Sequence, residues 1–222
     1  MIHPPESEYP PNIRFIKRDI LAPLPQEWLG RFDIVHARFL ITGIKDFPAL
    51  IRRLSTLLKS GGYLVILEPE LKCRLTTSSR SSQDEGAEHS TAKTLEEVCP
   101  GIARYNKIAL QAMQSFGMDM QATSKIPSYI LESGSFEEQS VKTQCKELPM
   151  SDWSEDPRMK QIGECQLSNS LAYPDTIKRM VLASSIIDEV EFEIAKKGYQ
   201  DDIRSGQGRP VLPIWCIWAK RK

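Results

Sequence analysis

The stretch from residue 32 to residue 71 constrains the fold more than any other part of this chain. Two nearly continuous apolar runs, FDIVHARFL at 32–40 and YLVILEPEL at 63–71, flank a helical pattern at 45–62. Such runs are typical of strands that are covered on both faces of a sheet. Strand, helix and strand in direct succession form a βαβ unit, which requires parallel strands joined by a right-handed crossover. The sequence therefore predicts an α/β fold.

The helix inside this unit carries its own start and stop signals. Asp46 can cap its N-terminus, and Pro48 suits its first turn. Gly61 and Gly62 end the helix, and Lys59 complements the C-terminal end of its dipole. Apolar residues at i, i+3, i+4 and i+7 spacing form one face, which consists of Phe47, Leu50, Ile51, Leu54, Leu57 and Leu58.

The rest of the chain adds strands and helices to this unit. The further predicted elements are strands at 12–20 (NIRFIKRDI), 136–148 and 211–222, and helices at 94–116 and 123–133. Two or three more helices are expected between residues 156 and 198, with Pro174 near the start of one of them. Residues 76–92 have low complexity and predict a mobile loop. No internal repeat is evident, so residues 1–222 are interpreted as a single domain.

Charge and cysteine usage exclude several classes of function. The 29 basic and 29 acidic residues cancel, which gives a nucleic-acid or anionic-membrane role no support. No run of about 18 apolar residues is present, and the polar, proline-rich N-terminus is unlike a secretory signal. The five scattered cysteines form no CxxC pair, so no metal site is expected. These features favour a reducing compartment, the cytoplasm or alternatively the nucleus.

Four stretches, in order along the chain, resemble the small-molecule class I methyltransferases of filamentous fungi, the LaeA-like group. They are PPNIRFIKRDI at 10–20, the βαβ stretch at 32–70, ELPMSDWSEDPRMKQIG at 147–163 and PIWCIWAKRK at 213–222. The resemblance implies a Rossmann-like sheet to which they contribute the third, fourth, fifth and last strands. It also implies methyl transfer from S-adenosylmethionine (SAM) to a small secondary metabolite.

The sequence departs from this family at its start. In the family, a glycine-rich loop after the first strand approaches the cofactor with its backbone N–H groups. Here the only GxG is Gly206-Gln207-Gly208, which precedes a strand. We therefore expect a reduced class I methyltransferase fold that lacks the first two strands, with extra helices between the last two. The strand at 12–20 then either pairs with the strand at 32–40 or leaves it as an open edge, which a homodimer or a complementing chain would cover.

The resemblance assigns cofactor contacts to the ends of two strands. Asp19 would accept a hydrogen bond from the adenine amino group, and Ile20 would pack on the adenine ring. His36 and Ala37 would lie at the carboxyl end of the next strand, where open α/β sheets bind ligands. Without the resemblance, Asp19 is interpreted as an ordinary acidic residue at the end of a strand.

The candidate catalytic residues are His36, Arg38 and Glu68. His36 is a candidate general base or polar pocket wall, or else a buried histidine with one hydrogen bond. Arg38 lies in an apolar strand and needs a partner, which Asp33 or Glu68 can supply, in which case its role is structural. Glu68 ends its strand and can orient a substrate or transfer a proton, or can be a solvated carboxylate.

A substrate pocket is expected from Glu70, Tyr129, Trp153 and Trp215. Glu70 shares a face with Glu68 because the two are separated by two positions along a strand. The aromatic residues are either pocket walls or core. Trp215 and Trp218 fall on opposite faces of one strand, so only one of them can face a ligand.

Three functions remain open at this point. The first is SAM-dependent methyl transfer, which relies on positioning donor and acceptor in line. The second is a cofactor-independent cyclase or pericyclase of the Diels–Alder type, in which a shaped pocket preorganises the substrate. The third is a non-catalytic partner or regulator that associates through the open sheet edge.

Overall fold

The βαβ unit forms the centre of the structure, a computed structural model that describes residues 10–76 and 93–222. β1 (Phe32–Arg38) and β2 (Leu58–Pro69) pair in parallel on either side of α1 (Phe47–Leu57). Asp46 caps α1 by accepting a hydrogen bond from the backbone N–H of Ala49 at 2.8 Å. The predicted apolar face of this helix is buried throughout, so the α/β prediction is confirmed.

The two glycines after α1 belong to a strand and not to a helix end, because β2 begins directly at Leu58. A Cβ atom on Gly62 would lie 3.0 Å from the carbonyl oxygen of Asp33 and 3.1 Å from that of Phe32. Glycine is therefore needed where β2 passes close to the backbone of β1.

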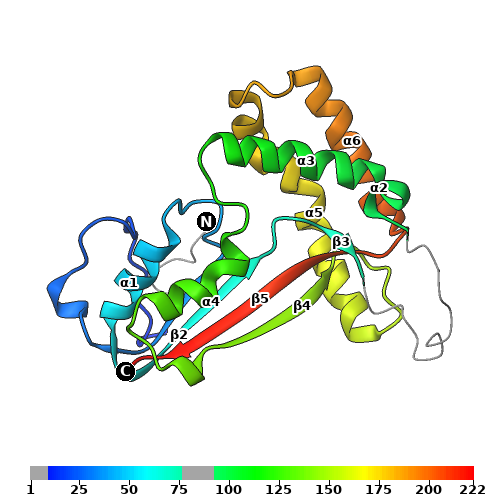
Figure 1. Ribbon diagram of the computed structural model, residues 1–222. Coiled ribbons are helices and arrows are strands. Elements are labelled where there is room, and N and C mark those ends of the chain that lie inside the picture. Colours follow the sequence, from blue (N-terminus) through cyan, green and yellow to red (C-terminus); the bar gives the residue numbers. More distant parts are fainter. Residues whose placement is uncertain (1–9, 77–92) are drawn as a thin grey trace.

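The remaining elements extend this unit into a mixed sheet of five strands (Figure 1). The other strands are β3 (Arg74–Leu75), β4 (Lys142–Pro149) and β5 (Pro210–Lys220). The order is β1-β2-β5-β3, and β4 also pairs with β5. β5 runs antiparallel to β2, β3 and β4, so β1 and β2 form the parallel pair of the sheet.

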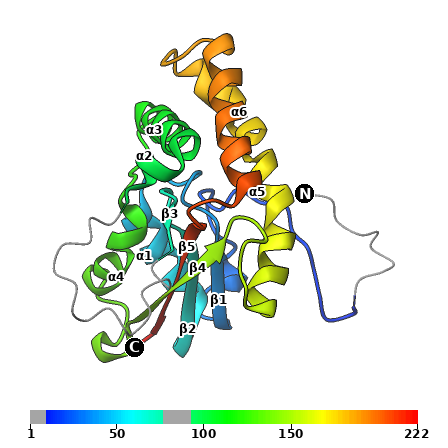
Figure 2. The same ribbon diagram turned by 90° about the vertical axis from the view of Figure 1, so that its right-hand side faces the viewer.

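The helices divide into a group that covers the sheet and a group that stands beyond its end. They are α2 (Leu95–Val98), α3 (Pro100–Ser115), α4 (Ala122–Glu132), α5 (Pro157–Ala183) and α6 (Glu189–Ser205), in addition to α1. Two short 3-10 turns lie at Gln26–Trp28 and Glu138–Ser140. Figure 2 shows α1 and α4 on one face of the sheet, and Figure 1 shows α3, α5 and α6 next to the end toward which β2 runs.

Each helix group forms its own apolar core. In the first core, α1 and α4 pack on Leu64, Ile66 and Ile217, which are at most 1% exposed. In the second core, Tyr105, Phe192 and Tyr199 join α3 to α6 and α5. α3 crosses α6 closely, since a Cβ atom on Gly101 would lie 2.1 Å from the carbonyl oxygen of Gly198.

The other face of the sheet near β1 is open. Ile34 and Tyr63 are neighbours in the β1–β2 register, and their exposed fractions are 63% and 42%. Among the described residues, β1 pairs with β2 alone. β1 is therefore an edge strand whose apolar side chains on this face are exposed to solvent.

The predicted strand at 12–20 is wrong, because these residues belong to no strand. Ile13, Phe15 and Ile16 are between 43% and 60% exposed. A run with strand propensity becomes a strand only when a neighbour accepts its backbone hydrogen bonds, and β1 does not pair with it. The alternative prediction, an open edge at β1, is the one that the described residues show.

Several other boundaries also differ from the prediction. Pro174 lies inside α5 and not near the start of a helix, because α5 runs continuously over 27 residues. The predicted helix at 94–116 is divided at Cys99 into α2 and α3, and the strand expected at 136–148 begins only at Lys142. Most of the predicted loop at 76–92 lies outside the described residues. No described helix is both long and apolar enough to cross a membrane.

Candidate functional site

The loop that follows β1 is fastened by a buried carboxylate at the end of β2. Glu68 is 0% exposed, and its two oxygens accept hydrogen bonds from the backbone N–H groups of Leu40 at 2.7 Å and Ile41 at 3.1 Å. Phe39, directly before them, has a φ of 53°. Glu68 therefore holds a strained turn at the carboxyl end of β1 in one position.

Burial and hydrogen bonding act in opposite directions on Glu68. Burial raises the pKa of this carboxyl above its ordinary value, and the two backbone donors lower it by a smaller amount. Both oxygens already accept a backbone hydrogen bond, so Glu68 acts here by positioning the loop. The prediction that it is catalytic stays a prediction.

A cavity of 240 Å³ lies beyond the carboxyl ends of β1 and β2. The sheet side contributes Phe39, Ile41 and Pro69 to its wall. The helical side contributes mainly residues of α3, α5 and α6, which are Asn106, Gln166, Asn169, Ser170, Tyr173 and Tyr199. The ends of parallel strands are where open α/β sheets bind ligands, so this cavity is the candidate functional site.

The cavity wall is polar in places but carries no ionised side chain among its described residues. Burial raises the pKa of the Cys73 thiol to about 12, and it raises the pKa values of Tyr173 and Tyr199 as well. All three groups are therefore neutral at pH 7. Such a wall suits a neutral molecule and offers no thiolate nucleophile.

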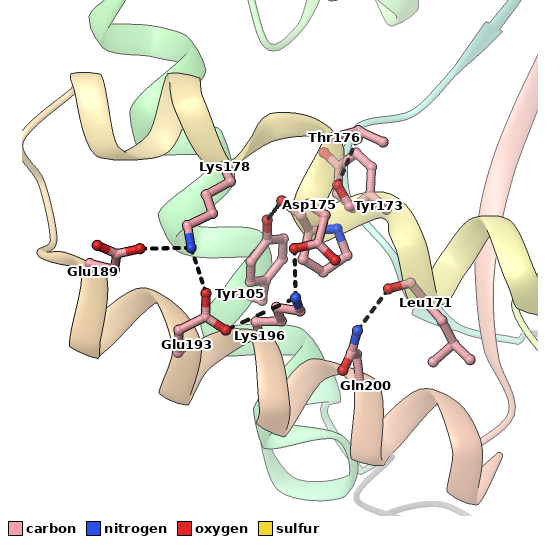
Figure 3. Close-up of polar contacts among 11 residues, drawn as sticks. Tyr105, Leu171, Tyr173, Asp175, Thr176, Lys178, Glu189, Glu193, Lys196 and Gln200 are labelled. Carbon is pink, nitrogen blue, oxygen red and sulfur yellow. Dashed lines mark hydrogen bonds and ion pairs between the residues drawn. The ribbon is translucent and has the colours of Figure 1, made fainter.

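The helical wall is held rigidly by an outer layer of polar contacts between α5 and α6 (Figure 3). Lys178 bridges Glu189 at 2.9 Å and Glu193 at 2.7 Å, and Lys196 pairs with Asp175. Closer to the cavity, the amide of Gln200 donates to the carbonyl of Leu171 at 2.8 Å. These contacts tie the residues beside the cavity to the neighbouring helix.

The predicted catalytic and cofactor residues lie elsewhere. His36 and Arg38 are exposed, whereas Ala37 points into the first core and is 8% exposed. Asp19 is exposed and accepts a hydrogen bond from the N–H of Leu21 at 2.8 Å, and Ile20 packs against the first core. None of these five residues lines the cavity.

The predicted pocket residues are not brought together either. Glu70 faces Arg74 at 3.9 Å, and the hydroxyl of Tyr129 donates to Asp119 at 3.3 Å. The indole of Trp153 donates to the carbonyl of Pro210 at 3.1 Å and lines a separate groove, whereas Trp215 packs on the first core. Tyr129 also packs on the first core, so Tyr129 and Trp215 share one surrounding, whereas Glu70 and Trp153 lie in two others.

Sequence reasoning missed the helical wall of the cavity. One signal was available, because Asn106 interrupts the apolar face formed by Ile102, Ala109 and Met113 on α3. A polar residue in the buried stripe of an amphipathic helix points either to an internal hydrogen bond or to a ligand. Ser170 gave no such signal, because the periodicity of α5 is weak around it.

The described residues do not assemble a complete cradle for the predicted cofactor, SAM. Among them, no strand leads into a glycine-rich loop that opens a helix, and Asp19 and His36 are both exposed. They also contain no group of three His, Cys, Asp or Glu side chains that could hold a metal ion. The described residues by themselves therefore do not form a SAM-binding site.

Comparisons with known proteins agree on a methyltransferase relationship. The chain is 24% identical to "Secondary metabolism regulator laeA" of Coprinopsis cinerea over 221 residues, which cover 100% of this chain and 52% of that protein. It is 36% identical to "N-methyltransferase verN" of Clonostachys rogersoniana over 70 residues, 31% of this chain and 24% of that protein. The chain thus spans about half or less of the length of these relatives.

Among solved structures, one that the chain matches is the phosphoethanolamine N-methyltransferase 2 of Haemonchus contortus in complex with phosphomonomethylethanolamine and S-adenosylhomocysteine. It is 16% identical and has a TM-score of 0.38, and the match covers 87% of this chain and 34% of that chain. The profile of the family described as "Methyltransferase domain" matches residues 4–117, about half of the 222 residues. The chain therefore belongs to the methyltransferase domain family.

Proposed function

We propose that this protein binds the small-molecule acceptor of a methyl transfer reaction in fungal secondary metabolism, and that the cavity at the ends of β1 and β2 is the acceptor site. The observation that carries this proposal is the partly open cavity without charged lining residues at this position in a methyltransferase domain. One relative named as a regulator of secondary metabolism and another named as an N-methyltransferase support the substrate class.

The cavity contributes to such a reaction by positioning. Methyl transfer needs donor and acceptor in line, and holding both in place can remove a large part of the barrier. Phe39 and Ile41, fixed through Glu68, would hold the acceptor from the sheet side and exclude water. Asp19, Ile20, His36 and Ala37 are the residues that we propose for the donor, SAM, by their resemblance to the family.

Titration calorimetry of the purified full chain with SAM tests this function. Because the described residues supply only part of a SAM cradle, we expect weak, submillimolar binding, together with a product heavier by one CH2 group when fungal metabolite extracts are added. An absence of SAM binding at millimolar concentration, with and without such an extract, would refute methyl transfer by this chain.

A second candidate is a cofactor-independent cyclase or pericyclase. Two observations favour it: the cavity offers a neutral, shaped wall, and the described residues do not complete a SAM cradle. A cyclisation needs neither a nucleophile nor a donor, because a preorganised pocket suffices. A product isomeric with its substrate, formed without added SAM, is the expected outcome. Products that always gain mass would exclude this reaction.

A third candidate is association through β1, with a second copy of this chain as the partner. Phe39, just beyond β1, donates its N–H to Leu67 of β2 at 3.0 Å. Because backbone N–H groups alternate in direction along a strand, those of His36 and Arg38 point to the open edge. Two such edges can pair about a two-fold axis and extend the sheet. Because the net charge of the chain is zero, two copies do not repel each other through their net charge.

Sedimentation velocity of the full chain tests this association. We expect a concentration-dependent dimer, which Ile34→Lys abolishes by placing a charge beside the open edge. Val190→Lys is the matched control, because Val190 is also exposed, at 69%, but lies on α6. A monomeric wild type at high concentration would refute the proposal.

A further inference from the structure

Two buried side chains in the cavity wall each carry a polar atom that has no hydrogen-bond partner among the described residues. They are Asn106 of α3, 6% exposed, and Ser170 of α5, 2% exposed. The unpartnered atoms are the amide Nδ2 of Asn106 and the hydroxyl Oγ of Ser170. Burying such atoms without partners destabilises a fold, so their joint presence on one cavity wall calls for an occupant.

The two side chains come from different helices and reach the same space. Both line the 240 Å³ cavity, together with the rings of Tyr173 and Tyr199. The α5 segment that carries Ser170 is tied to α6 through the contact between Gln200 and Leu171.

The nearest polar neighbour of Asn106 does not satisfy its amide. The Asn106 side chain favours the thiolate form of Cys73, but burial dominates and keeps this thiol protonated. A neutral thiol is a weak acceptor. The amide N–H groups of Asn106 thus remain available to an oxygen acceptor inside the cavity.

We propose that Asn106 and Ser170 are the polar recognition pair for a neutral, mainly apolar ligand of about two fused rings that carries a carbonyl or hydroxyl oxygen. The size follows from the cavity volume, because an apolar cavity of about 150 Å³ holds benzene and this one has 240 Å³. The oxygen follows from the donors of Asn106 and Ser170. The lack of charge follows from the wall, in which no ionised described residue could balance a ligand charge.

This inference rests on the proposed acceptor site but is tested without SAM. The probes are 2-naphthol and naphthalene, which share a two-ring body and differ by one hydroxyl. Both fluoresce, so equilibrium binding to the full chain can be followed directly. We expect 2-naphthol to bind at least about tenfold more tightly than naphthalene, since the extra hydrogen bonds also satisfy groups that are otherwise unpaired.

Variants separate recognition from a structural role. Asn106→Leu and Ser170→Ala should each reduce the preference for 2-naphthol by about threefold to tenfold and leave naphthalene binding within about twofold. Asn106→Leu should also raise the melting temperature of the free protein, because an unpaired buried amide is replaced by an apolar group of similar size. Ser168→Ala, at an exposed position on the same helix, is the matched control and should change neither preference nor stability.

The outcomes decide between a ligand and a structural water. Equal affinity for the two probes, or an unchanged preference in both variants, would overturn the proposal and leave a bound water as the partner of the two groups. If Asn106→Leu does not fold, Asn106→Ala and Ser170→Ala still measure the preference. Loss of SAM binding in the calorimetry above would refute methyl transfer but would not alter these affinities, so the two failures are distinguishable.

Discussion

The open face of β1 and the cavity beyond its end differ in the residues that they expose and bury. β1 carries the residues that sequence motifs favour, His36 and Arg38, yet both are exposed to solvent. The cavity carries Asn106 and Ser170, which no motif indicates, yet both are buried with unpaired polar atoms. Resemblance to a family thus points to positions on the chain, whereas burial without a partner points to a place where a ligand is needed.

Glu68 connects the two regions, so its replacement should cause the largest loss in the free energy of unfolding. Glu68→Ala leaves the N–H groups of Leu40 and Ile41 without acceptors in a buried turn. We expect a loss of about 3 kcal/mol in the free energy of unfolding, measured by urea denaturation. Glu70→Ala is the control and should cost less than about 1 kcal/mol, because the Glu70 side chain is 42% exposed and its ion pair is long. Equal losses in the two variants would contradict the linking role of Glu68.

The helical wall should be sensitive at the crossing of α3 and α6. Gly101→Ala places a Cβ atom against the carbonyl of Gly198, so the helices must separate. We expect a loss of about 2 kcal/mol, together with weaker 2-naphthol binding, because the cavity wall moves. Gly43→Ala is the matched control, since its nearest neighbour would lie at 3.7 Å, and it should change stability by less than about 0.5 kcal/mol. Unchanged stability of Gly101→Ala would show that the crossing is loose.

The raised pKa of Glu68 should make the free energy of unfolding depend on pH, with a smaller effect than the Glu68 and Gly101 substitutions. Its value in the folded state is raised above the ordinary 4.5, so the folded protein favours the protonated carboxyl. The contribution of Glu68 to stability is therefore largest below pH 4.5 and falls as the pH rises through the raised pKa. Urea denaturation of wild type and Glu68→Gln from pH 4 to pH 7 should show that the wild type loses stability relative to the variant, since all other titrating groups are common to the two. A wild-type stability that rises relative to Glu68→Gln would refute the assigned sign.

The exposed residues of β1 should have the smallest effect on stability. His36→Ala and Arg38→Ala are each expected to change the free energy of unfolding by less than about 0.5 kcal/mol. If His36 acts as a general base, the turnover of its variant should nevertheless fall by about a hundredfold or more. Unchanged turnover in both variants would assign the open face of β1 to association and not to catalysis.

Local patterns predicted the centre of the fold well. The cap at Asp46, the apolar face of α1 and the two flanking runs are consistent with one another, so the βαβ unit follows from the sequence. The same reasoning failed at 12–20, because strand propensity cannot say whether a neighbouring strand is available. It also failed at Pro174, which α5 accommodates within a continuous helix.

The candidate site was much harder to predict than the fold. Its walls come from the loop after β1, from β2 and β5, and from α3, α5 and α6, and Asn106 and Ser170 are 64 positions apart in the sequence. Asn106 differs from its helix only as a polar residue in an apolar face, and Ser170 is unremarkable on α5. Only their burial on one wall, without partners, distinguishes them.

The sequence alone determined the methyltransferase relationship, the α/β class and the parallel pairing of β1 with β2, because these depend on local periodicity and on recognisable stretches. The tertiary structure alone decided that β1 is an open edge and that a neutral cavity lies beyond it. The physical reason is that pairing and burial are properties of distant residues brought together. A side chain is unsatisfied only in relation to everything that packs around it.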